Sequence, residues 1–79
     1  MGDKISKKEL QEAKNVLSAR GVSRFDRERV ESVFRGDMDE TGLQSGINRK
    51  ELAKGLDYLK KKVSKDTFAK VDEALKKKM

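Results

Sequence analysis

A short pattern recurs four times along this chain and restricts it to a helical fold. In each copy an apolar residue precedes Ser, Asp or Asn, and a second apolar residue follows five positions after the first. The polar residue can cap the free N–H groups that begin a helix, and the two apolar residues can pack across the cap. The four copies begin at Ile5, Phe25, Ile47 and Val63. They predict helices near residues 6–20, 26–35, 48–62 and 64–77.

Apolar residues follow each helix start at helical spacing, so each helix has one face to bury. The expected core residues are Leu10, Ala13, Val16, Leu17, Val30, Val33, Phe34, Leu52, Ala53, Leu56, Leu59, Phe68, Val71, Ala74 and Leu75. The first helix should end at Gly21 and the second at Gly36, because glycine often follows the last helical residue.

The two halves of the chain resemble each other. Ile5-Ser-Lys-Lys-Glu-Leu recurs as Ile47-Asn-Arg-Lys-Glu-Leu, 42 positions later, and residues 29–35 recur as 70–76, 41 positions later. Duplication of a helical hairpin explains this similarity; chance likeness between two amphipathic hairpins is the alternative. Neither hairpin could bury its apolar face alone. We therefore expect an all-α fold with one domain over residues 1–79, in which four short helices form two hairpins in a compact bundle.

Composition argues against catalysis. The chain has no Cys and no His, which excludes disulfides, thiolate metal sites and nucleophiles activated by His. A 79-residue domain rarely contains a pocket large enough for paired-carboxylate chemistry. We expect a non-enzymatic protein without a cofactor. No segment is apolar enough for a membrane span or a secretory signal, so we expect a cytoplasmic protein that does not act at a membrane.

The segment 36–46 contains three glycines and has no helical period, which predicts a long loop between the two halves. Asp37, Asp39 and Thr41 alternate along it and precede Gly42. This spacing resembles the first half of an EF-hand calcium loop, and Ile47 and Glu51 match the aliphatic residue and the bidentate glutamate of its second half. The resemblance covers about residues 27–60. It implies an EF-hand-like crossing of the second and third helices, with Asp37, Asp39, Thr41 and Glu51 as metal ligands.

The loop also departs from that family. It is three residues too long, because Leu43-Gln44-Ser45-Gly46 occupies the place of one residue. Thr41 replaces the expected Asp, Asn or Ser, and Glu51 also fits the capping glutamate of the third helix. We therefore expect the EF-hand-like arrangement without a tight calcium site. Divalent-cation binding at 37–51 is retained as a second alternative function.

Positive charge is concentrated in the second half. Residues 1–46 hold nine basic and nine acidic side chains, whereas residues 47–79 hold eleven basic and five acidic ones. The densest cluster is Lys60, Lys61, Lys62 and Lys65, with Tyr58 as the nearby aromatic residue. Aspartates and glutamates four residues before Lys61, Lys70, Lys76 and Lys77 predict ion pairs along the helices. The leading interpretation is a module that binds another protein; binding of nucleic acid or another polyanion through the cluster is the alternative.

Overall fold

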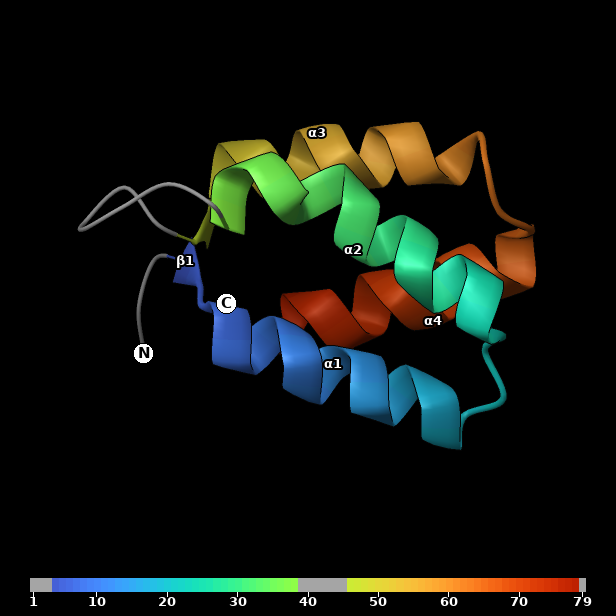
Figure 1. Cartoon of the computed structure of the whole chain (residues 1–79). Coiled ribbons are helices and arrows are strands. Elements are labelled where there is room, and N and C mark those ends of the chain that lie inside the picture. Colours follow the sequence, from blue (N-terminus) through green and yellow to red (C-terminus); the bar gives the residue numbers. More distant parts are fainter. Residues whose placement is uncertain (1–3, 39–45, 79) are drawn as a thin grey trace.

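The computed structural model describes residues 4–38 and 46–78, and these ranges confirm the predicted all-α fold (Figure 1). The helices are α1 (Lys7–Ala19), α2 (Arg24–Met38), α3 (Arg49–Lys60) and α4 (Lys65–Lys76). Helices α1 and α3 each pack against both α2 and α4. None of the four combines the length and apolar character that a bilayer span requires.

Three of the four predicted helix starts are confirmed, with caps at Ser6, Asn48 and Ser64. The caps at Ser6 and Asn48 form complete capping boxes. At α1 the N–H of Glu9 donates to Ser6 Oγ at 3.1 Å, and the N–H of Ser6 donates to Glu9 Oε1 at 2.9 Å. The chain therefore satisfies free N–H groups at both helix starts with its own side chains.

The predicted start of the second helix is wrong. Helix α2 begins at Arg24, and Ser23 rather than Asp26 occupies the capping position, where its hydroxyl accepts the Asp26 N–H at 3.3 Å. The buried residue before the cap is Val22, and Phe25 is 82% exposed. Val22-Ser23 offers the same apolar-cap pair as the other starts, and the turn holds Val22 in the core.

The turn between α1 and α2 shows how this happens. The N–H of Val22 donates to the Leu17 carbonyl at 2.9 Å, and the N–H of Gly21 donates to the Ser18 carbonyl at 3.1 Å. Gly21 has a φ of +86°. These are the two bonds of a Schellman motif, which requires a left-handed residue that glycine adopts at little cost. The predicted end of the first helix at Gly21 is confirmed.

The second helix runs further than predicted. Gly36 lies inside α2, which ends at Met38, so Asp37 is helical rather than part of a loop. Most of the predicted 36–46 loop, including Asp39 and Thr41, lies outside the described residues.

Two short strands, absent from the sequence-based expectations, relate the two halves. Strands β1 (Lys4–Ile5) and β2 (Ile47–Asn48) pair antiparallel, with Ile5 opposite Ile47. Each precedes the first helix of its half, so the pairing places equivalent residues of the two repeats face to face. An approximate twofold axis therefore passes between Ile5 and Ile47, relating α1 to α3 and α2 to α4 (Figure 1).

The core follows the same symmetry. Three pairs of residues at equivalent positions of the two halves are fully buried: Leu17 and Leu59, Val30 and Val71, and Phe34 and Leu75. This agreement supports the predicted duplication of a helical hairpin. The prediction that Val16 belongs to the core is wrong, since its side chain is 46% exposed at the edge of the α1 stripe.

Candidate functional site

The turn between α3 and α4 carries the predicted lysine cluster at one end of the bundle (Figure 1). Helix α3 ends with the N–H groups of Lys62 and Val63 both bonded to the Leu59 carbonyl, at 2.9 and 3.0 Å. Ser64 then caps α4 by accepting the Thr67 N–H at 3.2 Å. The tight turn holds four exposed lysine side chains close together: Lys60, Lys61, Lys62 and Lys65.

These four lysines differ from those of α4 in their pairing. The predicted ion pairs of Lys70, Lys76 and Lys77 with acids four residues earlier are confirmed, at 3.3, 3.2 and 3.5 Å. The predicted pair between Asp57 and Lys61 is not formed. No lysine of the cluster has an ion pair with any acid in the part of the chain that the structure describes, so its positive charge is not neutralised locally.

Tyr58 completes the cluster. It lies one turn before the end of α3 with half of its surface exposed, and the Lys62 ammonium lies 5.4 Å from the centre of its ring. This is a cation–π distance. The ring is thus fixed beside a positive charge while part of its face stays open to solvent.

A shallow groove of about 640 Å³ extends from Tyr58 between α2 and α3. Arg29 and Lys54 supply its basic side chains, and none of the ion pairs between described residues includes either one. The lining residues are Arg29, Ser32, Val33, Asp37, Glu51, Lys54, Gly55 and Tyr58.

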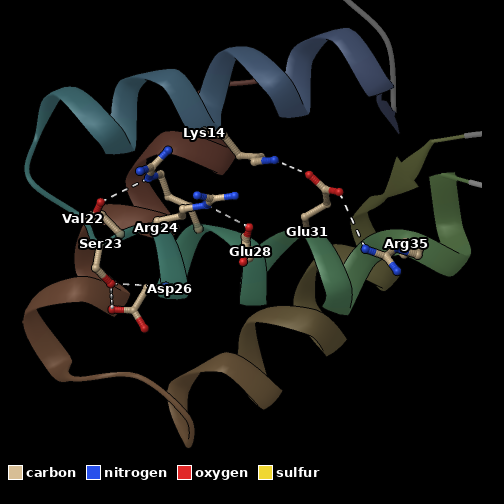
Figure 2. A network of polar contacts seen from close by, with 9 residues as sticks. Lys14, Val22, Ser23, Arg24, Asp26, Glu28, Glu31 and Arg35 are labelled. Carbon is tan, nitrogen blue, oxygen red and sulfur yellow. Dashed lines mark hydrogen bonds and ion pairs between the residues drawn. The ribbon is translucent and has the colours of Figure 1, made fainter.

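Ion pairs cover the opposite face of α2. The Lys14 ammonium donates to the Glu31 carboxylate, and this bond together with the charge of Lys14 lowers the pKa of Glu31 below its ordinary value of 4.5. Arg35 pairs with the same carboxylate at 3.8 Å, and Arg24 pairs with Glu28 at 3.2 Å (Figure 2). Two arginines of α2 have no ion pair between described residues: Arg27, which donates to the Val22 carbonyl at 3.2 Å, and Arg29, which lines the α2–α3 groove.

Two of the four proposed metal ligands, Asp39 and Thr41, lie outside the described residues, and the other two, Asp37 and Glu51, line the α2–α3 groove. The N–H of Asn48 donates to Glu51 Oε1 at 2.9 Å, and Asn48 Oδ1 accepts the Glu51 N–H at 2.7 Å. Glu51 thus serves as the capping glutamate of α3. The carbonyl of Asp37 accepts the Gly46 N–H at 3.1 Å. No group of three acidic side chains arranged to hold a metal ion occurs in residues 4–38 and 46–78.

Phe25, Arg29 and Lys54 were not among the residues that the sequence singled out for binding. Arg29 and Lys54 line one groove with Tyr58 because of how α2 crosses α3, which periodicity alone does not give. No family model, curated protein or solved structure matches this chain.

Proposed function

We propose that this chain is a small non-enzymatic interaction module that binds a negatively charged macromolecule. The observation that supports it is the cluster of Lys60, Lys61, Lys62 and Lys65, which are exposed and have no ion pairs within the described ranges. Concentrated charge of one sign attracts a partner of opposite charge and accelerates association.

An acidic protein surface and a nucleic acid both complement this charge. Lysine ammonium groups act as point charges and lack the planar fork that reads base edges, so binding should be weakly dependent on sequence. The contact between Lys62 and Tyr58 favours nucleic acid as a specific candidate, because an exposed ring beside a cation can stack on a base. Divalent-cation binding at 37–51 stays a separate prediction, with the Glu51 carboxylate already engaged in a cap.

The experiment compares two triple variants that remove the same charge. Lys60→Gln/Lys62→Gln/Lys65→Gln neutralises the cluster. Lys8→Gln/Lys76→Gln/Lys77→Gln neutralises three exposed lysines at the other end of the bundle. Circular dichroism should show that both variants fold, since exposed charges contribute little to stability.

Binding is then measured with oligothymidylate and with polyglutamate at about 50 mM salt, where phosphate and carboxylate contacts are strong. The cluster variant should lose about tenfold or more in affinity, and the control variant clearly less. Equal losses, or a flat titration of the unchanged protein with both probes, would contradict the proposal.

A further inference from the structure

In the repeat, the α2–α3 groove corresponds to the interface between α4 and α1. Ion pairs bridge that α4–α1 interface. Lys78 of the C-terminal turn pairs with Glu12 at 2.9 Å, and Glu73 pairs with Arg20 at 3.1 Å. Lys70 adds a bond to the Arg20 carbonyl at 3.3 Å. Charged side chains at this interface thus join two helices.

The α2–α3 groove has lost the acids that bridge its counterpart. Lys54 stands at the position equivalent to Glu12, and Ser32 stands at the position equivalent to Glu73. None of the ion pairs between described residues joins α2 to α3. Both replacements make the charge of this groove more positive, and its remaining acids are Glu51 and Asp37, the latter at the position equivalent to Lys78.

A third difference lies at the start of α2. In α4, Asp66 neutralises Lys70 at 3.3 Å. The equivalent pair in α2 is Phe25 and Arg29, so an aromatic ring replaces the acid and the guanidinium keeps its full charge. Phe25, at 82% exposure, is the most exposed large apolar side chain among the described residues. Spacings of four and three residues place Phe25, Arg29 and Ser32 on one face of α2. Arg29 and Ser32 line the groove, and Phe25 lies one turn beyond them toward the start of the helix.

A fourth difference lies on α3. Tyr58 stands at the position equivalent to Val16, which adds a second exposed aromatic ring. Lys54 and Lys62 lie four residues before and after it, and the Lys62 ammonium contacts its ring. Tyr58 therefore lines the groove between two lysines of α3, and Phe25 lies one turn beyond the groove next to Arg29 in α2.

We propose that the α2–α3 groove binds single-stranded nucleic acid, with Phe25 and Tyr58 stacking on bases and Arg29, Lys54 and Lys62 contacting phosphates. The inference rests on the polyanion-binding function proposed above and names its partner. Basic side chains alone would bind any polyanion. Exposed aromatic rings near basic side chains match a single strand, because the rings can stack on its bases while the cations contact its phosphates. A duplex hides the faces of its bases within the stack, so it should bind more weakly.

The first test uses the fluorescence of Tyr58, which is the only tyrosine in a chain without tryptophan. Oligothymidylate of about 15 nucleotides, at about 50 mM salt, should quench this emission on stacking. Polyglutamate should leave the emission unchanged. The affinity for oligothymidylate should fall as salt rises, with a log–log slope of about −2 or steeper, since the three groove cations each displace about 0.7 counterions and the other lysines of the cluster add to them.

The second test measures the affinity for a labelled oligothymidylate by anisotropy. Phe25→Ala and Tyr58→Val should each weaken binding about tenfold, because stacking of one base contributes about 1–3 kcal/mol. Both rings are exposed, so both variants should fold. Val16→Ala truncates the exposed residue at the position equivalent to Tyr58 on α1 and should leave affinity unchanged.

The outcomes separate this inference from the function on which it rests. If Phe25→Ala and Tyr58→Val both leave the affinity for oligothymidylate unaltered, the proposal that the groove binds the strand is overturned. Binding of polyanions by the lysine cluster would still stand. Equal affinity for a duplex of the same length, or binding of polyglutamate alone, would overturn it in the same way. Absence of binding to all three probes would overturn both proposals.

Discussion

Replacing Gly55 by Ala should destabilise the domain, although Ala is the better helix former. A Cβ atom at this position would lie 2.2 Å from Cε1 and 2.4 Å from Cζ of Phe34, and 3.1 Å from a methyl of Val33. Phe34 is fully buried, so its ring cannot move into solvent. Gly55 is thus required because α2 packs a large ring directly on the backbone of α3.

The expected destabilisation by Gly55→Ala is the difference between two opposing effects. Overpacking a core typically costs about 1–3 kcal/mol, and a clash with a buried ring belongs to the upper part of this range. Ala gains about 0.8–1.0 kcal/mol over Gly in a helix interior. The variant should therefore lose about 1–2 kcal/mol of unfolding free energy, with a fall in Tm of roughly 4–8 °C for each kcal/mol.

Urea denaturation followed by circular dichroism measures this change. The matched control is Gly36→Ala in α2, where an added Cβ would meet no atom within 4 Å. This variant should gain a few tenths to about 1 kcal/mol. The second variant is Gly55→Ala/Phe34→Leu, which installs the pair found at the equivalent positions, Ala13 and Leu75. It should restore part of the stability that Gly55→Ala loses. A Gly55→Ala protein as stable as the unchanged chain would refute this packing argument.

Three further outcomes follow from the caps, the ion pairs and the candidate cation site. Ser23→Ala should cost about 1 kcal/mol of unfolding free energy because it removes the cap of α2, and an unchanged urea midpoint would contradict that cap. The pKa of Glu31 is lowered in the folded state, so its charged form stabilises the fold above pH 4.5, and this stabilisation is lost as pH falls through the folded-state pKa. Glu31→Gln should therefore be less stable than the unchanged chain at neutral pH, and its stability should fall less on acidification. An equally steep acid transition in that variant would rule out this linkage. Millimolar calcium should leave the amide resonances of 46–51 in place, and saturable shifts at micromolar calcium would reveal the site that the capping role of Glu51 argues against.

Local chemistry made the helices predictable. The caps at Ser6, Asn48 and Ser64 depend on neighbouring residues alone, and the sequence identified all three. The start of α2 was misjudged because Phe25-Asp26 and Val22-Ser23 offer competing pairs of the same type. Tertiary packing decides between them, since the Schellman turn after α1 brings Val22 into the core.

The candidate site was predicted only in part, for a related reason. The lysine cluster is contiguous in the chain and could be found by counting charges. The groove joins Arg29 to Tyr58, which are far apart in the sequence, and its geometry depends on the close approach of α2 to α3 at Gly55. The repeat held the missing signal, because positions where its two copies differ in charge or aromatic character include Phe25 and Lys54.

Amide chemical-shift mapping with oligothymidylate at about 50 mM salt tests the central claim most directly. The account predicts saturable shifts at Arg29, Lys54, Tyr58 and Lys62, together with the rest of the α3–α4 turn. Amides around Glu12 at the equivalent α4–α1 interface should not shift, since ion pairs bridge that interface. A spectrum that does not change, or shifts confined to the α4–α1 interface, would contradict the account.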